Sequence, residues 1–403
     1  MIKFKLNGID ITADKEESIW QAAKKNNIDI PHLCHADEIG YDPNGNCRAC
    51  VVQVKGERTL AASCIRKPTE GMEVDSISDE VNSTQKIIFE LLAADQPCKA
   101  NHPDPESKFW KWSDKLGVDE KKFPNNKKIK KDISHPSMHV NLEACINCNL
   151  CVRACREVQS NDVIGMAYRG HESKVIFDFD DEMASSTCVG CGECVQACPT
   201  GALMEKSLLN EEGKRDIFPD KTVNTLCPYC GVGCQTKVFV KDNKIVQVDG
   251  RDGPANNKKL CVKGRFGFDY IHNDGRLKQP LIRKNNVKKE PIEDYANLKV
   301  SEYFREASWD EVIKLSSMKL KNIYESFGPS SICGFGSAKG SNEEAYLFQK
   351  LIRTAFQTNN VDHCTRLCHA SSVAALMECV GSGAVSAPFT AVNDSDCMII
   401  IGA

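Results

Sequence analysis

The grouping of the cysteines is the feature that most constrains this chain. The 403 residues include 22 cysteines, and many of them lie only two or three residues apart. The run CINCNLCVRAC at 145–155 recurs as CVGCGECVQAC at 188–198, offset by 43 residues. In a long chain of mixed charge, such spacing favours metal thiolates in a reducing compartment over disulfide bonds. The sequence therefore predicts several metal sites.

Composition limits the classes of partner and the compartment. The net charge is −3, from 52 Lys and Arg against 55 Asp and Glu, which implies no strong field for nucleic acid. The first residues alternate polar and apolar side chains and do not form a secretory signal. No apolar run approaches the roughly 18 residues that span a bilayer. We therefore expect a cytoplasmic protein without a membrane span or a nucleic-acid partner.

Periodicity gives a coarse map of the elements. The alternation around Ile2, Phe4 and Leu6 predicts a β-hairpin, and a helix is expected from Ser18 to Asn27. The apolar pattern further along predicts helices at 80–97, 309–327, 342–357 and 370–379, and strands at 237–240, 244–250, 331–336 and 396–403. The lysine-rich segment 121–132 has no apolar period and is expected to be a solvated linker.

The first cysteine group has the form C-x12-C-x2-C-x13-C and consists of Cys34, Cys47, Cys50 and Cys64. Four thiolates can hold two irons and two bridging sulfides. With NGNCRACVVQV at 44–54, the group resembles the β-grasp [2Fe–2S] module of respiratory NADH dehydrogenases, iron-only hydrogenases and NAD-linked formate dehydrogenases. A zinc site or free buried thiols are the alternatives.

The repeated run supplies two further groups. Each half has the C-x2-C-x2-C-x3-C spacing of bacterial two-cluster ferredoxins, in which the fourth cysteine binds the other [4Fe–4S] cluster. The expected ligand sets are therefore Cys145, Cys148, Cys151 and Cys198 for one cluster, and Cys188, Cys191, Cys194 and Cys155 for the other.

The fourth group comprises Cys227, Cys230, Cys234 and Cys261. Zinc could use four cysteines with such gaps. However, CPYCGVGC followed by CVKGRFG resembles the [4Fe–4S] domain that opens molybdopterin oxidoreductase subunits. The resemblance implies that Lys263 is a catalytic, cofactor-binding residue between cluster and pterin, where a cation would favour the arrival of an electron.

One site expected from the related subunits is missing between the first group and the repeat. The matching stretch DQPCKANHPDPESKFWKW contains only Cys98 and His102, which cannot hold a cubane. We expect Cys98 to be a buried thiol and His102 a loop histidine. The relay is then one cluster shorter than in the related subunits.

The adjacent pair Cys368 and His369 follows all of these groups. The stretch NNVDHCTRLCHASSVAALM at 359–377 resembles molybdenum- or tungsten-dependent formate dehydrogenases, whereas the related nitrate reductases have methionine after the cysteine. The resemblance implies that Cys368 is a catalytic and cofactor-binding ligand of Mo or W carried by two molybdopterin guanine dinucleotides. It implies that His369 moves a proton or orients formate. Without this resemblance, an adjacent Cys-His pair would more often have a packing role than a catalytic one.

The resemblance implies an α+β multidomain chain. It has a β-grasp [2Fe–2S] domain, a helical region without the His–Cys cluster ligands, a tandem [4Fe–4S] ferredoxin domain, a [4Fe–4S] domain of the Mo/W type and the α/β start of a molybdopterin oxidoreductase domain. The expected boundaries are 1–78, 79–119, 138–208, 220–276 and 277–403. The chain ends 34 residues after His369, so we expect an interrupted catalytic domain and no activity with formate alone.

The implied function is oxidation of formate to CO2, with electrons passing through three [4Fe–4S] clusters and one [2Fe–2S] cluster. Because the chain has no G-x-G-x-x-G fingerprint, a flavin- and NAD-binding diaphorase-type subunit is the expected partner. Two alternatives remain. One is a non-catalytic iron–sulfur module, either a truncated product or a subunit of a hydrogenase or NADH dehydrogenase complex. The other is a zinc-rich interaction protein.

Overall fold

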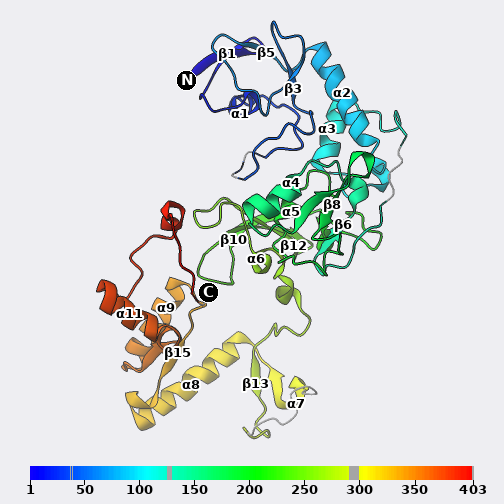
Figure 1. The fold of residues 1–403 in the computed structure, drawn as a ribbon. Helices are drawn as coiled ribbons and strands as arrows, with labels where there is room; N and C mark the ends of the chain where they lie inside the picture. The colour runs from blue at the N-terminus through cyan, green and yellow to red at the C-terminus, as the bar shows by residue number, and fades with distance from the viewer. Residues whose placement is uncertain (37, 39, 125–128, 290–298, 402–403) are drawn as a thin grey trace. The chain divides into compact units, whose positions relative to one another are not determined.

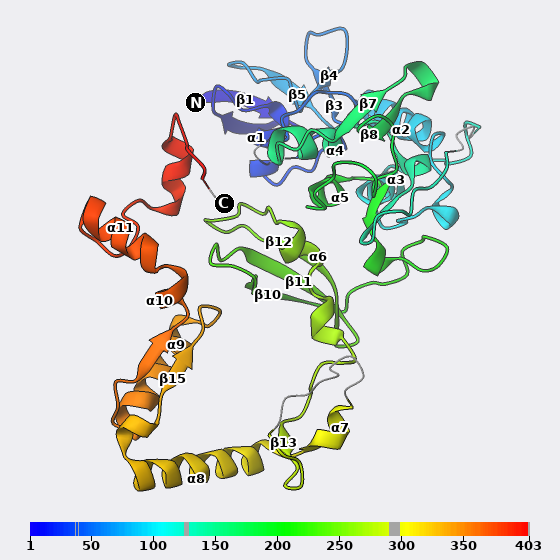
Figure 2. The same cartoon turned by 60° about the horizontal axis from the view of Figure 1, so that its bottom comes forward.

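The computed structural model describes residues 1–36, 38, 40–124, 129–289 and 299–401, so residues 125–128 of the lysine-rich segment lie outside it. The chain divides into two compact units (Figures 1 and 2). The first comprises residues 1–227 and 234–268, and the second comprises residues 228–233 and 269–403. None of the described helices has the length and apolar character needed to cross a membrane.

The N-terminal module is a five-stranded mixed sheet in the order β2-β1-β5-β3-β4. Its elements are β1 (Ile2–Leu6), β2 (Ile9–Ala13), α1 (Ile19–Lys25), β3 (Val51–Val54), β4 (Ala61–Ala62) and β5 (Glu73–Asp75). The predicted hairpin is confirmed, because β1 and β2 pair antiparallel while β1 and β5 are parallel. The predicted first helix is also confirmed, and Ser18 caps it with a capping box to Gln21.

Two helices follow, α2 (Asp79–Ala93) and α3 (Lys108–Leu116), capped by Ser78 and Ser107. The predicted helix at 80–97 ends early, at Ala93, where the hydrogen bonds tighten: the N–H groups of Asp95 and Gln96 donate to the carbonyls three residues before them. The two helices share an apolar core with the cysteine-bearing loops of the first module. Its buried members are Leu33, Ala49, Phe89, Ala93, Phe109 and Trp110.

The repeated region folds as two halves that exchange strands. Its elements are β6 (Met138–Val140), α4 (Leu150–Arg153), β7 (Ile164–Ala167), β8 (Lys174–Phe177), α5 (Glu193–Ala197) and β9 (Leu203–Glu205). A π-helical turn over Ala154–Val158 extends α4. Strand β6 of the first half pairs antiparallel with β9 of the second, and β7 pairs with β8. Each half therefore lies close to the cysteines of the other.

The last part of the first unit is a three-stranded antiparallel sheet followed by a short helix. Its elements are β10 (Lys221–Leu226), β11 (Gln235–Lys241), β12 (Lys244–Gly250) and α6 (Val262–Phe266). The strands predicted at 237–240 and 244–250 are confirmed, and their alternate valines form a small core. Asp242 and Asn243 both have positive φ, as a tight two-residue hairpin turn requires.

The second unit combines an antiparallel strand pair with a parallel pair. Its elements are β13 (Leu281–Arg283), α7 (Val300–Tyr303), β14 (Phe304–Glu306), α8 (Trp309–Phe327), β15 (Gly334–Gly336), α9 (Asn342–Lys350), β16 (Val361–His363), α10 (Thr365–Cys368) and α11 (Ala370–Val380). The prediction for 309–327 is confirmed, and that for 370–379 is met to within a residue. The helix predicted at 342–357 changes to a π-helical turn at Leu351.

The prediction of a buried strand at 396–403 is wrong for the residues that the structure describes, 396–401. These residues adopt no regular structure, and Ile399 and Ile401 are 84% and 89% exposed. A buried parallel strand needs a hydrogen-bonded neighbour and cover on both faces. The parallel sheet described here contains only β15 and β16, so this run has neither.

Candidate metal and cofactor sites

The four cysteines of the first group converge in the loops of the N-terminal sheet. Cys34, Cys50 and Cys64 are almost fully buried, and the Cys47 backbone N–H donates to Cys34 Sγ over 3.5 Å. The hydrogen bond from the Cys47 thiol lowers the pKa of Cys34 to about 6. The corresponding bond from Cys64 lowers the pKa of Cys50 to about 7. The same two hydrogen bonds raise the pKa of Cys47 and of Cys64, so the four sulfurs lie in two hydrogen-bonded pairs, close enough to share one metal cluster.

The second group lies in the interior of the repeated region. Cys145, Cys148, Cys151 and Cys198 line one cavity, with Leu142 and other apolar side chains as its walls. Burial raises the pKa of Cys148 and of Cys151, and the neighbouring thiols raise both further. Thiolates held in such an apolar cavity need a compensating positive charge, which iron would supply.

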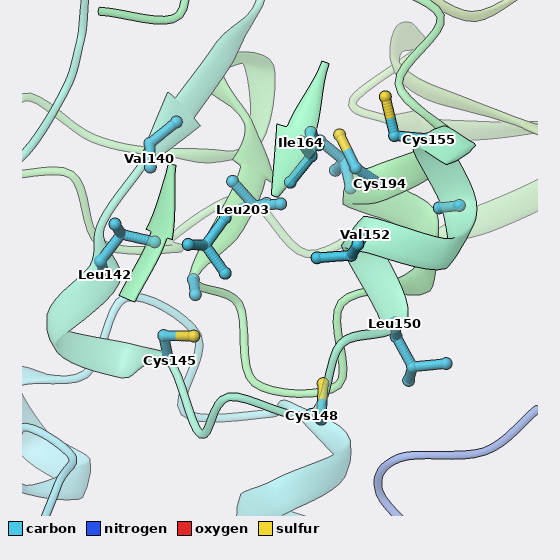
Figure 3. Packing of buried hydrophobic residues seen from close by; sticks show 14 of the residues in the cluster. Val140, Leu142, Cys145, Cys148, Leu150, Val152, Cys155, Ile164, Cys194 and Leu203 are labelled. Atoms are coloured by element: carbon cyan, nitrogen blue, oxygen red, sulfur yellow. The ribbon is translucent and has the colours of Figure 1, made fainter. Parts of the chain in front are cut away.

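The third group lies at the other end of the same core, where Figure 3 shows Cys155 and Cys194 apart from Cys145 and Cys148. Burial raises the pKa of Cys194, followed by repulsion from the charges of Cys191, Cys188 and Cys155. The structure therefore brings Cys155 to the run that contains Cys194. Across the described parts of the chain, no group of three or more His, Cys, Asp and Glu side chains is arranged to hold a single metal ion.

Three cysteines of the fourth group belong to the first unit. The Cys227 N–H donates to the Cys234 carbonyl over 2.9 Å, and Cys261 is the N-cap residue of α6. A Cβ added to Gly264 would lie 3.5 Å from Cys227 Sγ, so this thiol lies against α6. Cys230 belongs to the second unit.

Lys263 is exposed on α6, two residues after Cys261. Its backbone carbonyl accepts a hydrogen bond from the Gly267 N–H over 2.9 Å, which helps to close this short helix. The side chain is therefore carried on the helix that begins at one of the cysteines of the fourth group.

A buried polar network that the sequence did not reveal joins these modules within the first unit. Tyr41 Oη donates to Glu193 Oε1 over 2.8 Å, and Lys259 Nζ lies 3.1 Å from the same oxygen. Lys259 also pairs with Glu38 at 3.2 Å. Glu193 is 2% exposed and lies between Cys191 and Cys194. Its only sequence signal is an acidic residue inside a cysteine run, which alone has many explanations.

The second unit contains a cavity of about 760 Å³ at the carboxyl ends of β15 and β16. The loop 337–341 after β15 and the start of α9 form its wall, with Lys339 and Glu344 among the lining residues. Ser341 caps α9 and forms a capping box with Glu344. The carboxyl ends of parallel strands, beside a helix N-terminus, are a common place for nucleotide-like ligands, and the volume suits one.

Cys368 and His369 follow β16 closely. Cys368 ends α10, and His369 is the junction with α11, donating its backbone N–H to the Thr365 carbonyl over 2.8 Å. Both side chains are exposed. Cys364 is also important here, because its Sγ accepts the Ala338 N–H over 3.1 Å. The turn that carries Cys368 is therefore attached to the loop that lines the cavity.

The expectation of a buried thiol at Cys98 is wrong, whereas His102 lies in a loop as expected, directly after a 3-10 turn. Cys98 is exposed, at the start of a 3-10 turn over Lys99–Asn101. His102 is 1% exposed, its Nε2 lies 2.9 Å from Gln96 Oε1, and burial lowers its pKa to about 4. The histidine packs edge-on against Trp110, so it belongs to the apolar packing around α3.

Sequence profiles of four families match the chain in order. They are the 2Fe-2S iron-sulfur cluster binding domain at residues 1–79, the 4Fe-4S dicluster domain at 144–202, the molybdopterin oxidoreductase Fe4S4 domain at 220–273 and molybdopterin oxidoreductase at 276–403. These matches and the clustered thiols define an iron–sulfur oxidoreductase. More particularly, the chain belongs to the molybdopterin oxidoreductase family.

Its curated relatives are longer proteins. "Probable oxidoreductase YjgC" of Bacillus subtilis is 30% identical over 439 residues, which cover 98% of this chain and 42% of the relative. "Putative formate dehydrogenase SAB2186c" of Staphylococcus aureus and "Putative formate dehydrogenase SH0748" of Staphylococcus haemolyticus are each 28% identical, with the same two coverages. The chain thus spans about two fifths of the length of these relatives.

Among solved structures, an NAD+-reducing [NiFe]-hydrogenase in the H2-reduced state matches with a TM-score of 0.46 and 24% identity. The match covers 53% of this chain and 92% of that one.

Proposed function

We propose that this chain is part of the catalytic subunit of a formate dehydrogenase. The observation that carries the proposal is the position of Cys368 and His369. They follow β16 directly, and their turn is attached through Cys364 to the wall of the 760 Å³ cavity. Neither residue lines the cavity, but a thiol and an imidazole on a turn attached to its wall, downstream of four cysteine groups, suit a redox reaction on a small substrate. The names of two relatives point to formate.

The cysteine groups are proposed to hold one [2Fe–2S] and three [4Fe–4S] clusters. The convergence of Cys34, Cys47, Cys50 and Cys64 in a sheet of mixed strands supports a β-grasp [2Fe–2S] module. The cavity lined by Cys198 and the charge contact between Cys155 and Cys194 support exchange of the fourth ligand between the two ferredoxin clusters. Cys227, Cys230, Cys234 and Cys261 would hold the last cluster.

The molybdopterin-type cofactor would bind in the second unit. When bound, its Mo or W takes up the two electrons released as formate becomes CO2 and a proton. Cys368 would hold this metal through its thiolate, a soft donor suited to it. His369 would take the proton or orient the formate carboxylate. Lys263 would hold a positive charge beside the cluster of its own domain, which favours the arrival of an electron there.

Electrons are proposed to leave through the cluster at 227–261, then the ferredoxin pair, then the [2Fe–2S] module. The direct packing of the loop around Cys34 against the core that contains Cys145 and Cys148 supports this order, because it leaves no room for a further domain between them. A flavin- and NAD-binding subunit is the proposed acceptor.

The test is a count of metals on protein purified without oxygen. Four clusters predict about 14 iron atoms per chain, together with about one Mo or W where the pterin cofactor is bound. The whole catalytic subunit of which this chain is proposed to be part should reduce a viologen dye with formate when it holds Mo or W. Cys368→Ala should keep the iron and lose this reduction, whereas Cys379→Ala, at an exposed thiol in α11, should keep both.

Iron near the expected value without Mo or W in any preparation, and no effect of Cys368→Ala, would instead identify an iron–sulfur electron-transfer module. A colourless, iron-free preparation would contradict both readings.

A further inference from the structure

Arg265 connects two of the cysteine groups by hydrogen bonds. Its backbone N–H donates to the carbonyl of Cys261 over 3.1 Å, within α6. Its side-chain Nε donates to the carbonyl of Cys191 over 2.9 Å. One residue thus contacts a cysteine of the fourth group and a cysteine of the third.

The guanidinium is completely buried. Arg265 is 0% exposed and is the largest fully buried side chain in the described structure. Its Nη atoms lie 3.5 Å from Glu193 Oε2 and 3.3 Å from Asp249 Oδ1. A charge removed from water persists only where partners compensate it, and two carboxylates do so here.

The cysteine loop is shaped to admit this side chain. Gly192 has a φ of +72°, and a Cβ added there would lie 2.2 Å from Arg265 Cδ and 2.7 Å from Phe266 Cζ. The residue between Cys191 and Glu193 must therefore lack a side chain for the guanidinium to reach the Cys191 carbonyl. The close fit places a fixed positive charge against one cluster loop.

We propose that Arg265 is a positioning residue for electron transfer: it fixes the third cysteine group against the fourth and raises the reduction potential of the third. The proposal rests on the proposed binding of clusters by these cysteines. Reduction adds one negative charge to a cluster, and a buried cation nearby stabilises that charge more strongly than it would in water. The same hydrogen bonds provide a path from the Cys261 backbone to the Cys191 backbone.

The sign of the effect follows from the buried carboxylates. Without the guanidinium, Glu193 and Asp249 remain beside the loop with less compensation, so adding an electron becomes less favourable. Removal of the Glu193 charge has the opposite effect. A purely structural role for Arg265 would alter stability without moving the potential in these two opposite directions.

The test is a redox titration followed by electron paramagnetic resonance on the anaerobically purified protein, with iron counted in each variant. Arg265→Gln should lower the equilibrium constant for reduction of the cluster at 155 and 188–194 about tenfold or more, which is about 59 mV for one electron. Glu193→Gln should raise the constant. Arg215→Gln, which removes an arginine paired with Asp104 at 3.2 Å, is the matched control and should leave it unchanged.

The proposal is overturned if the equilibrium constants for reduction in Arg265→Gln and in Glu193→Gln both lie within about twofold of the wild-type constant. If Arg265→Gln fails to bind iron, the proposal is tested with Arg265→Lys and Glu193→Gln instead. The reduction potential of Arg265→Lys should then differ less from the wild-type potential than that of Glu193→Gln does. Absence of cluster signals in the wild-type protein would refute the ligand assignment itself, and iron content separates that result from a failure of Arg265 alone.

Discussion

Phe109→Ala tests whether the apolar core of α2 and α3 stabilises the region between the first cysteine group and the repeated run. Phe109 is 0% exposed, stacks on Phe89 with ring centroids 5.7 Å apart, and meets Trp110 at 5.0 Å. The same core contains Leu33 and Ala49, which are sequence neighbours of cysteines in the first group. Removing the ring leaves a cavity among side chains that are anchored on three separate elements.

The expected cost is about 3–5 kcal/mol of unfolding free energy, the usual range for a buried Phe→Ala substitution. In a unit of this size, each kcal/mol lowers the melting temperature by about 2–4 °C, so a fall of roughly 6–20 °C is expected. Circular dichroism gives the melting temperature, and the visible absorbance of the clusters reports whether the [2Fe–2S] site loosens with the core.

Phe179→Ala is the matched control, because Phe179 has the same side chain and is 96% exposed. Its effect should stay within about 0.5 kcal/mol. If Phe109→Ala melts within 2 °C of the wild type, the core formed by α2 and α3 does not stabilise the cysteine loops, and the reasoning fails.

Two further predictions concern a metal ligand and a titrating carboxyl group. Cys148→Ser should lose about four iron atoms per chain, whereas Cys98→Ser, at an exposed thiol, should lose none; equal iron in both variants would contradict the ligand set. Burial, followed by repulsion from Asp249, raises the pKa of Glu205 from its ordinary value of 4.5 to about 7. The folded protein then holds this proton over a pH range where the unfolded chain has lost it, so stability falls as pH rises from about 4.5 to 7. Glu205→Gln should flatten this slope and raise the stability at pH 8 by on the order of 2–3 kcal/mol; an unchanged slope in urea titrations at several pH values would refute it.

Local chemistry made much of this molecule predictable. The hairpin turn at Gly8, the Ser18 cap and the amphipathic period of 309–327 each act within a few residues, and the structure has all three elements. The failed strand at 396–403 shows the limit. An apolar run specifies burial, but a strand also needs a neighbour with which to pair, and no short window of sequence contains that information.

The sequence by itself determined the positions of the cysteine groups and the order of the modules, because the distance between two thiolates on one loop depends on their covalent spacing. Only the tertiary structure decided which distant groups meet. Arg265 lies 74 residues from Cys191 and yet donates to its carbonyl, and Tyr41 lies 152 residues from Glu193 and bonds to its carboxylate. The sequence alone did not identify these polar residues as buried, because each of them could equally well lie on the surface. Packing buried them, and burial made their pairing obligatory, since an unpaired charge removed from water costs several kcal/mol.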